Sequence, residues 1–249
     1  MSLLTKIRSL RGVRPAREPE LPEVARTVAI IMDGSARWAR KRSLPVAAGH
    51  RAGTRAVRRT VEAAIDLGVE TLVVYAFSTE NWTRPPDEVE ALMEIFGEAI
   101  EREQPDLVRQ GVRVRFLGRT DRAPEWLRGK IAALEGETED NESLNLWIAF
   151  VYGGRAELVE AARRLIEAGV DADDLDETAF AAALYAPELP DPDLLVRTSG
   201  EKRVSNFLLW QLAYAELVFT DTLWPDFGER ELRTALAEYA NRRRRFGGR

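Results

Sequence analysis

The sequence contains no cysteine and a single histidine, His50. The lack of cysteine excludes disulfide bonds, thiolate metal sites and cysteine nucleophiles. Any metal ion bound by this chain must therefore be held by oxygen atoms or by that one imidazole. The sequence also lacks an apolar run near the roughly 20 residues that a membrane-spanning helix needs, and residues 1–26 lack the apolar centre of a signal peptide. We therefore expect a cytoplasmic protein.

Charge of one sign is not strongly in excess, because 36 Lys and Arg residues face 41 Asp and Glu residues, a formal net charge of −5. This balance argues against a general polyanion binder, so we expect no nucleic-acid partner. The run Arg242–Arg245 offers a nucleic-acid patch as an alternative. Its helical context and the acidic chain as a whole favour a solvated face.

Length and hydrophobic content bound the domain organisation. The 249 residues, 45% of them hydrophobic, suffice for one large core, and we expect a single domain over residues 27–249. Residues 1–26 are rich in arginine and proline and are predicted to form a mobile basic tail. The leucines Leu3 to Leu10 leave open a short amphipathic turn that touches the inner face of a membrane.

Apolar, β-rich runs alternate along the chain with segments of helical periodicity. Helical spacing is clearest over Asp87–Gln104, where apolar residues recur every three or four positions. The alternation predicts an α/β fold with a mostly parallel central sheet of about six strands and helices on both faces. The predicted strands are Val28–Met32, Thr71–Phe77, Val112–Leu117, Leu144–Val151, Leu194–Val196 and Leu217–Thr220.

Polar residues follow the ends of these strands. Asp33 follows the first strand, Ser78–Arg84 the second, Arg155 the fourth and Arg197 the fifth. Because the carboxyl ends of parallel strands line one crevice of an open sheet, we expect these loops to share a site.

The first loop, Asp33–Trp38, has the composition of an anion site. Small residues let backbone N–H groups approach a phosphate, a helix start adds partial positive charge, and Arg37 adds a full one. Asp33 alone would repel a phosphate, but a bridging Mg²⁺ ion takes carboxylate and phosphate oxygens together. Two simpler interpretations stay open: Asp33 caps the helix, and Trp38 belongs to the core.

The loops after the second and fifth strands add further donors. Ser78, Asn81 and Arg84 can donate to a diphosphate, whereas the threonines among them suit an ordinary capped loop. The segment Arg197–Phe207 combines arginines and serines with a glycine turn, which predicts a second anion pocket, with a solvated basic loop as the alternative. Glu216 borders an apolar strand and needs a metal ion or an arginine as partner.

Five stretches of the chain stand out together: Val28–Gly34 with Arg37 and Trp38, Ala48–Gly53, Tyr75–Trp82, Tyr152–Arg155, and Arg197–Phe227. Over residues 28 to about 247 they resemble bacterial cis-prenyltransferases, the undecaprenyl diphosphate synthase family, and five blocks in one order are a specific match. The resemblance implies a Mg²⁺-dependent enzyme that joins isopentenyl diphosphate to an allylic diphosphate such as farnesyl or geranyl diphosphate. Its product would be a Z-polyprenyl diphosphate, the precursor of a cell-wall lipid carrier.

The resemblance also implies roles for single residues. Asp33 and Asn81 would be catalytic: Asp33 would hold Mg²⁺, assisted by Glu216 from a subunit interface, and Asn81 would handle the proton that leaves isopentenyl diphosphate, unless released diphosphate accepts it. The allylic diphosphate would be bound by Gly34, Ser35, Ala36, Arg37, Trp38, His50, Ser78, Thr79, Glu80, Trp82 and Arg84. Isopentenyl diphosphate would be bound by Arg197, Arg203, Val204 and Ser205.

The growing chain would lie in an apolar channel between the Val89–Ile100 helix and one face of the Leu144–Val151 strand. Trp147 and Phe150 lie on opposite faces of that strand, and at least one of them is expected to narrow the channel.

This sequence departs from the family pattern at Ser35, Ala36, Val46 and Val151, where relatives usually carry asparagine, glycine, arginine and asparagine. Ser35 can still donate a hydrogen bond, and Ala36 suits the turn if its φ is negative. Val46 cannot contact a diphosphate through its side chain. We therefore expect weaker allylic binding unless a neighbouring arginine, such as Arg42 or Arg51, compensates.

Two other functions compete with this interpretation. A trans-prenyltransferase would carry paired Asp-rich motifs, but Asp173–Glu177 has no second copy and precedes a helix, where acidic residues are favoured. A non-catalytic partner subunit of a prenyltransferase complex would lack Asp33 and the Arg197–Ser205 residues, which are present. A homodimer is expected, because the run Phe207–Phe219 has more apolar length than one buried face requires and the resemblance implies the same.

Overall fold

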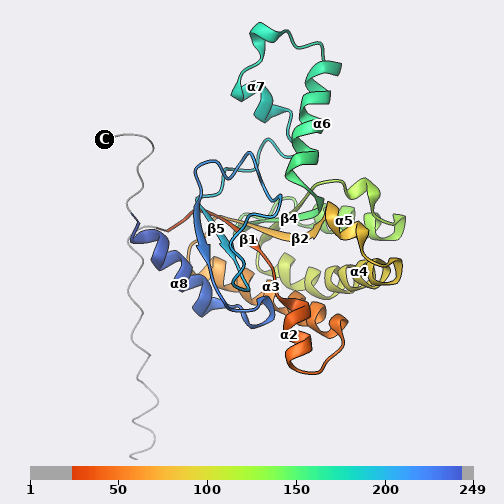
Figure 1. The fold of residues 1–249 in the computed structure, drawn as a ribbon, viewed down its shortest axis with the longest axis vertical. Helices are drawn as coiled ribbons and strands as arrows, with labels where there is room; N and C mark the ends of the chain where they lie inside the picture. The colour runs from red at the N-terminus through yellow and green to blue at the C-terminus, as the bar shows by residue number, and fades with distance from the viewer. Residues whose placement is uncertain (1–23, 243–249) are drawn as a thin grey trace, which may run out of the picture.

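The protein is built on a six-stranded sheet in which every neighbouring pair is parallel. A computed structural model describes residues 24–242 of the chain, and the strand order is β3-β4-β2-β1-β5-β6 (Figure 1). This confirms the predicted α/β fold, and each predicted strand is found within about one residue of its expected bounds. The strands are β1 (Thr27–Ile31), β2 (Thr71–Ser78), β3 (Val112–Leu117), β4 (Leu144–Tyr152), β5 (Leu194–Arg197) and β6 (Glu216–Phe219).

The strands read as continuous apolar runs because both faces of the sheet are covered. All five residues of β1 are buried, as are all four of β5, which is the pattern of a central parallel strand. The helices are α2 (Ser35–Lys41), α3 (Val46–Asp66), α4 (Pro86–Arg109), α5 (Glu125–Glu137), α6 (Gly154–Glu167), α7 (Glu177–Ala182) and α8 (Glu229–Ala240), with short 3-10 turns η1 (Thr79–Thr83), η2 (Thr120–Arg122), η3 (Ala172–Asp174) and η4 (Trp224–Asp226).

The two faces of the sheet are covered differently. Helices α3, α4, α5 and α8 pack on one face and contribute to the larger core cluster (Figure 1). The other face is covered mainly by the non-helical segments 184–189 and 204–212, so the expectation of helices on both faces is met only in part. Segment 204–212 cannot continue as a helix because Ser205, Asn206 and Leu208 adopt positive φ.

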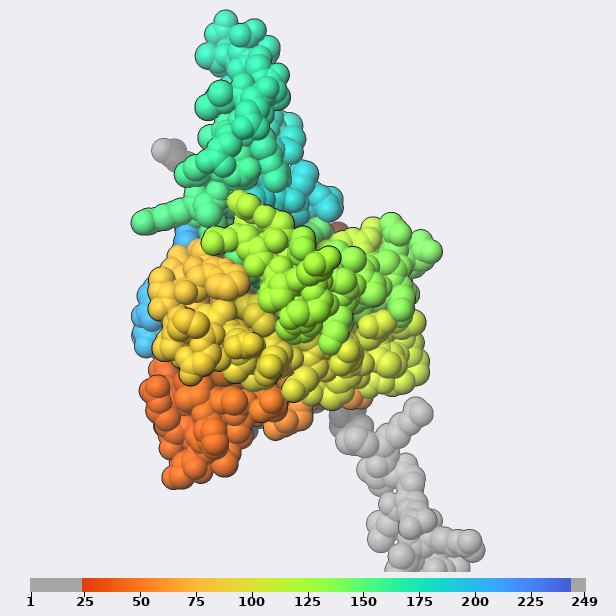
Figure 2. Space-filling model, turned by 90° about the vertical axis from the view of Figure 1, so that its right-hand side faces the viewer, coloured from red at the N-terminus to blue at the C-terminus, as the bar shows by residue number. Residues whose placement is uncertain are grey.

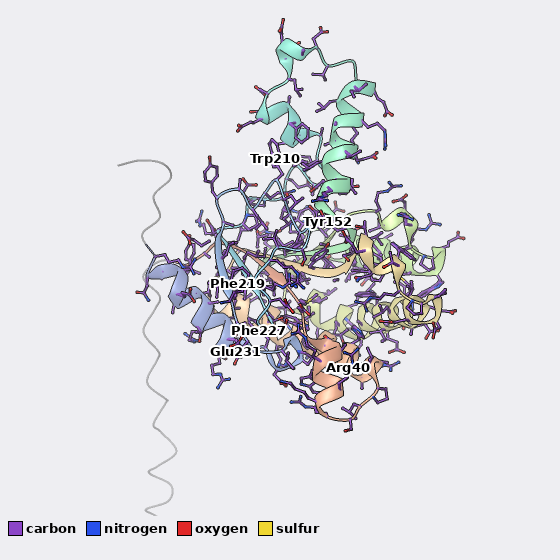
Figure 3. All side chains as sticks on the ribbon, in the orientation of Figure 1. Arg40, Tyr152, Trp210, Phe219, Phe227 and Glu231 are labelled. Atoms are coloured by element: carbon purple, nitrogen blue, oxygen red, sulfur yellow. The ribbon has the colours of Figure 1, made fainter. Side chains whose placement is uncertain are left out.

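Helices α6 and α7 project beyond the sheet as an arm, residues 154–182 (Figures 1 and 2). Phe180 on α7 stacks on Trp210 with ring centroids 4.8 Å apart, at the base of the arm (Figure 3). The acidic string Asp173–Glu177 lies at the far end of the arm, where Asp176 accepts a hydrogen bond from the N–H of Ala179 and caps α7. Its predicted role as a helix start is confirmed.

Helix α4 begins one residue before and ends five residues after the predicted Asp87–Gln104. It continues through Pro105, which lies inside the helix. A proline removes one backbone donor, and beyond it Asp106 still pairs with Arg58 on α3 and Leu107 still packs against the larger core cluster.

The described part of the chain includes three residues that the sequence assigned to the tail. Ala25 is fully buried, and the backbone N–H of Arg26 donates to Asp193. The rest of the predicted tail, residues 1–23, lies outside the described residues, as does most of the Arg242–Arg245 run. Within residues 24–242, none of the helices combines the length and the apolar content needed to cross a bilayer.

The sheet order creates one switch point. Strand β1 lies between β2 and β5; the chain builds β2, β3 and β4 on one side of it and β5 and β6 on the other. Loops that leave β1 and β5 therefore diverge and open a crevice at their carboxyl ends, the usual ligand position in such sheets.

Candidate active site

Asp33 is the centre of the crevice. It follows β1, and its carboxylate accepts hydrogen bonds from Arg197 at 2.9 Å and from Arg37 at 3.1 Å. Burial alone would raise the pKa of Asp33, but the bonds from Arg197 and Arg37 outweigh burial and hold the pKa below its ordinary value. The carboxylate is therefore charged at neutral pH and draws together side chains from two loops.

The backbone around Asp33 is fixed as well. Its N–H donates to the Thr198 hydroxyl oxygen at 2.9 Å, and the same hydroxyl donates to the Asp33 carbonyl at 2.7 Å. The next residue, Gly34, has φ of 112°, and a Cβ there would lie 2.9 Å from a side-chain carbon of Leu223. A turn this tight requires glycine.

Arg197 is 3% exposed and lies at the end of β5. Besides Asp33, it donates to the Ser205 hydroxyl and to the Arg203 carbonyl, both at 2.6 Å. Its Nε has no hydrogen-bond partner among residues 24–242. The predicted second anion loop is thus folded around the buried Arg197, whereas the Arg203 side chain is exposed and pairs with Glu201 at 2.5 Å.

The loops that form the two predicted anion pockets are in direct contact. Arg37 from the first loop donates to the backbone carbonyl of Ser199 at 3.0 Å and to its hydroxyl at 2.5 Å. Together with the Asp33–Arg197 pair, this contact joins loops more than 160 residues apart in sequence. Ser199 is one of the serines of the predicted second anion pocket, and its φ of 82° shows that the loop turns sharply there.

The loop after β2 is closed by a reciprocal cap. The Ser78 N–H donates to Asn81 Oδ1 at 2.9 Å, and the Ser78 side chain accepts from the Asn81 backbone. Glu80 is exposed and accepts from Asn206 at 2.7 Å. Arg84 is held 2.7 Å from Glu88, one turn into α4.

His50 faces this loop from α3. Burial, followed by the nearby Arg84 charge, lowers the pKa of His50 below its ordinary value of 6.5. The imidazole is therefore neutral at pH 7. Its Nε2 is buried and has no hydrogen-bond partner within the described part of the chain. Buried polar atoms usually have a partner, so this atom is a candidate to bind a ligand.

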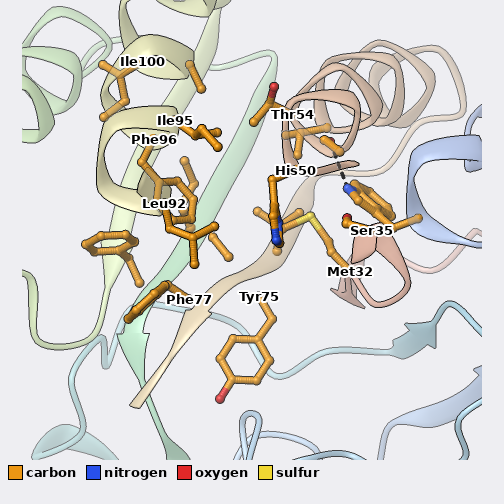
Figure 4. A pocket seen from close by; sticks show the side chains of 18 of the residues that line it. Met32, Ser35, His50, Thr54, Tyr75, Phe77, Leu92, Ile95, Phe96 and Ile100 are labelled. Carbon is orange, nitrogen blue, oxygen red and sulfur yellow. Dashed lines mark hydrogen bonds between the residues drawn. The ribbon is translucent and has the colours of Figure 1, made fainter. Parts of the chain in front are cut away.

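A cavity of about 370 Å³ runs from the crevice into the core (Figure 4). Its polar mouth includes nine of the predicted site residues: Asp33, Gly34, Ser35, Ala36, Arg37, His50, Ser78, Asn81 and Arg84. Beyond the mouth the walls are apolar, with Leu92, Ile95 and Phe96 on α4 and Leu146, Ile148 and Phe150 on β4. The predicted channel between these two elements is confirmed.

A bulge and the strand alternation decide which aromatics reach the cavity. The β2–β4 register shifts between Tyr75 and Phe77, which turns Phe77 to the cavity side of the sheet. Phe150 packs 5.0 Å from Phe96 and 5.7 Å from Phe77, between ring centroids. Trp147 points to the opposite face, into the second core cluster, so of the two predicted narrowing residues Phe150 is the one in the cavity.

Some predicted site residues lie elsewhere. Among residues 24–242, the cavity lining does not include Trp38, Thr79, Glu80, Trp82, Arg197, Arg203, Val204, Ser205 or Glu216. The expectation that Trp38 belongs to the core is wrong: its indole N–H donates to Asp226 at 2.6 Å and the Arg42 guanidinium lies 4.1 Å above its ring. Trp38 is held at the half-buried surface of α2.

Glu216 has the arginine partner that its place beside an apolar strand requires. It begins β6 and pairs with Arg242 at 2.6 Å. Asp33 follows the carboxyl end of β1, whereas Glu216 lies at the amino end of a parallel strand, so one chain does not bring the two acids together. Within residues 24–242 no three acidic or histidine side chains gather into a metal-binding group.

The positions that depart from the family pattern can now be placed. Ala36 lies within α2 and has negative φ, as its turn requires. Val46 starts α3, and the two arginines expected to compensate for it are engaged elsewhere, Arg42 with Asp226 and Arg51 with Glu98. Val151 adopts φ of 51°, a region in which asparagine is several-fold enriched and a β-branched residue such as valine is an outlier.

The comparisons with known proteins agree with this geometry. Residues 31–247 match the family model described as "Putative undecaprenyl diphosphate synthase". The chain is 50% identical over 238 residues to the ditrans,polycis-undecaprenyl-diphosphate synthase ((2E,6E)-farnesyl-diphosphate specific) of Xanthomonas axonopodis pv. citri, covering 94% of this chain and 93% of that protein. It is 47% identical over 230 residues to the isoprenyl transferase of Bacillus subtilis, covering 91% and 88%.

A solved structure shares the whole fold. The lavandulyl diphosphate synthase of Lavandula x intermedia, in complex with dimethylallyl diphosphate, matches with a TM-score of 0.87 and 38% identity, covering 90% of this chain and 98% of that one. Sequence, fold and family model thus agree over nearly the whole described chain, which belongs to the undecaprenyl diphosphate synthase family of cis-prenyltransferases.

Proposed function

We propose that this chain transfers an allylic prenyl group to isopentenyl diphosphate and elongates the product with Z double bonds. One observation carries the proposal: the charged crevice around Asp33 opens directly into an apolar cavity. A molecule with a diphosphate head and a hydrocarbon tail matches both parts at once. This pairing also disfavours a non-catalytic partner subunit, which would not need charged residues at the mouth.

The test is a turnover experiment. The protein is incubated with labelled isopentenyl diphosphate, Mg²⁺, and either farnesyl or geranyl diphosphate, and the products are separated by chain length. We expect a series of prenyl diphosphates that grow by whole isoprene units. Binding of both substrates without any incorporation would contradict the proposal and favour the partner-subunit alternative.

The reaction breaks the bond between the allylic carbon and its diphosphate oxygen and forms a bond from that carbon to isopentenyl diphosphate, which then loses a proton. Arg37, His50 and Arg84 are suited to stabilise the departing diphosphate as negative charge grows on it. Arg197, Arg203 and Ser205 are suited to orient isopentenyl diphosphate. The Oδ1 atom of Asn81 already accepts the Ser78 N–H, so we assign the proton to a diphosphate oxygen and an orienting role to Asn81.

The donor set suits Mg²⁺ that is bound partly by substrate. Mg²⁺ is usually held by one or two carboxylates together with phosphate oxygens and water, and the charged Asp33 carboxylate provides the first of these at the mouth. Mg²⁺ would neutralise charge on the diphosphate when bound. Glu216 would contribute only from a second copy of the chain, because its own chain keeps it at the other end of the sheet.

We infer farnesyl diphosphate as the preferred primer and a long-chain product as the outcome. The support is the 50% identity with a relative named for farnesyl diphosphate and a cavity that continues from the mouth past Ile95 to Leu134. A preference for geranyl diphosphate in a competition assay would overturn this part alone.

A homodimer is supported by exposed apolar side chains on the arm and in the segment before β6. Val159 and Ile166 on α6 are 60% and 78% exposed, and Tyr214 in the segment before β6 is 73% exposed. Strand β6 is also an edge of the sheet. Light scattering at micromolar concentration should give about twice 28.0 kDa, and a value of 28.0 kDa would contradict a dimer.

The cytoplasmic location and a peripheral membrane contact stay predictions from composition, and the tail proposed to make that contact lies outside the described residues. Cell fractionation of the full chain and of a chain lacking residues 1–23 would test both. We expect the full chain in the cytoplasmic fraction, with any membrane-bound share lost on truncation.

A further inference from the structure

Asn206 lies where three loops meet. It follows Ser205 in the segment that carries Arg197 and Arg203, and it adopts φ of 62°. Asparagine tolerates this left-handed region better than most residues.

Each polar group of its side chain is engaged with a different segment. Its Oδ1 accepts from the backbone N–H of Arg155 at 2.8 Å, and its Nδ2 donates to Glu80 Oε1 at 2.7 Å. Its backbone carbonyl accepts from the Gly154 N–H at 2.7 Å. Asn206 thus connects three segments: the Arg197–Phe207 loop proposed to bind isopentenyl diphosphate, the start of α6, and the η1 loop.

The meeting point is also tightly packed. A Cβ on Gly153 would lie 2.4 Å from the Thr79 hydroxyl oxygen and 3.0 Å from Asn206 Nδ2. The three segments are therefore close-packed, so a displacement of one segment displaces the others.

Asn206 and Glu80 each neighbour a residue of one of the two proposed substrate sites. Ser205 accepts from Arg197 at 2.6 Å on one side. Glu80 precedes Asn81 on the other. Burial would raise the pKa of Glu80, but the bond from Asn206 lowers it below the ordinary value, so the bond joins an amide to a charged carboxylate and is of the stronger kind.

We propose that Asn206 is a positioning residue that couples the two diphosphate sites. Binding of isopentenyl diphosphate at Arg197 and Ser205 fixes Asn206, and Asn206 in turn holds Glu80 and the Ser78–Arg84 loop in place for the allylic diphosphate. The inference rests on the proposed function, since it takes these loops as the two substrate sites. By linkage, each substrate must then raise the affinity for the other by the same factor.

The experiment measures this factor directly. Isopentenyl diphosphate is titrated calorimetrically into the full chain with Mg²⁺, once alone and once with saturating farnesyl thiolodiphosphate, an unreactive allylic analogue. The ratio of the two Kd values is the coupling factor. We expect at least about a fivefold ratio for the parent, the lower end of typical coupling between sites.

Three variants distinguish loss of the Asn206–Glu80 hydrogen bond from loss of the fold. Asn206→Asp keeps the left-handed tolerance and the acceptor for the Arg155 N–H, but places a carboxylate against Glu80, so the ratio should fall to within about twofold of one. Glu80→Gln keeps an acceptor for Asn206 and should keep most of the coupling. The double variant E80Q/N206D reverses the bond, because the introduced amide would donate to the introduced carboxylate, and should restore the coupling.

Glu80→Ala provides a second test in case the Asn206 variants do not fold. Glu80 is exposed, so its removal leaves the core intact. It should also lower the ratio to within about twofold of one. Parent-like coupling in N206D or E80A, or no restoration in a folded double variant, would overturn the inference. A parent that binds both ligands and turns over substrate but shows no coupling would overturn it too, while leaving the proposed function intact; a parent that binds neither ligand would contradict the function itself.

Discussion

The crevice and the cavity below it are built by different means. The crevice is held by a few directed contacts between distant loops, such as Asp33 with Arg197 and Arg37 with Ser199. The cavity is shaped by the volume of apolar side chains on α3, α4 and β4. Under the proposed function, the crevice therefore recognises the head of a substrate by charge and geometry, and the space in the cavity limits the length of its tail. Changes in the first region should alter rate and affinity, and changes in the second should alter product length.

The largest effect is expected for Asp33→Ala. It removes the acid that orders both arginines, so turnover should fall by at least about 10²-fold. The direct Asp33–Arg197 bond predicts that the affinity for isopentenyl diphosphate falls as well. Steady-state kinetics and calorimetry measure both effects.

Asp33→Asn separates the effect of the lost charge from the effect of the lost side-chain volume. It keeps the volume and removes the charge, and should lose activity nearly as strongly. Activity within tenfold of the parent in either variant would remove Asp33 from the centre of the account. Both variants leave Arg197 buried without its counter-charge, so both should also melt earlier than the parent.

Phe150→Ala should alter the cavity and leave the crevice intact. It opens space between Phe96 and Phe77, so products should lengthen by at least one isoprene unit, with little change in the allylic KM. Trp147→Ala is the matched control, because Trp147 lies on the same strand but on the other face of the sheet. Equal lengthening by both variants would mean that loosened packing, not cavity space, sets the product.

His50 lies where the two regions meet. His50→Leu removes a polar atom that lacks a partner in the described chain, so the allylic KM should rise by about tenfold, the value of one hydrogen bond to a charged group. His50→Gln keeps an N–H donor and should stay within about threefold of the parent. An unchanged KM in the leucine variant would exclude His50 from diphosphate binding.

The lowered pKa of His50 also predicts a pH effect on stability. The unfolded chain takes up a proton as pH falls below the ordinary value of 6.5, whereas the folded chain resists it. The contribution of neutral His50 to stability is therefore present above about pH 6.5 and is lost as pH falls below it. Between about pH 7.5 and 5.5 the melting temperature of the parent should fall more than that of His50→Gln, and parallel curves would contradict this.

The smallest effect is expected for Val46→Arg. An arginine at the start of α3 adds a donor near the first anion loop, where Arg42 and Arg51 are already paired with other acids. The allylic KM should fall by up to about tenfold, while the KM for isopentenyl diphosphate stays nearly unchanged. Arg42→Ala and Arg51→Ala should not raise the allylic KM; a rise would show that one of them reaches the diphosphate.

The sequence predicted the sheet well because β-strands buried on both faces are plain apolar runs, and it predicted the crevice because strand ends in such a sheet share one edge. It did not predict which of Phe150 and Trp147 faces the cavity, because both faces of β4 are buried under apolar side chains and strand alternation alone does not distinguish them. Asn206 was missed because its proposed role depends on a left-handed backbone and on partners 51 and 126 residues away. Only the folded chain brings these together.

The geometry of the newly formed double bonds distinguishes cis- from trans-prenyl transfer. Farnesyl diphosphate and ¹³C-labelled isopentenyl diphosphate are incubated with the protein and Mg²⁺, and the purified product is examined by NMR. The account predicts that every added unit carries a Z double bond and that the primer keeps its E bonds. Added units with E double bonds, or no added units at all from a protein that binds both substrates, would contradict it.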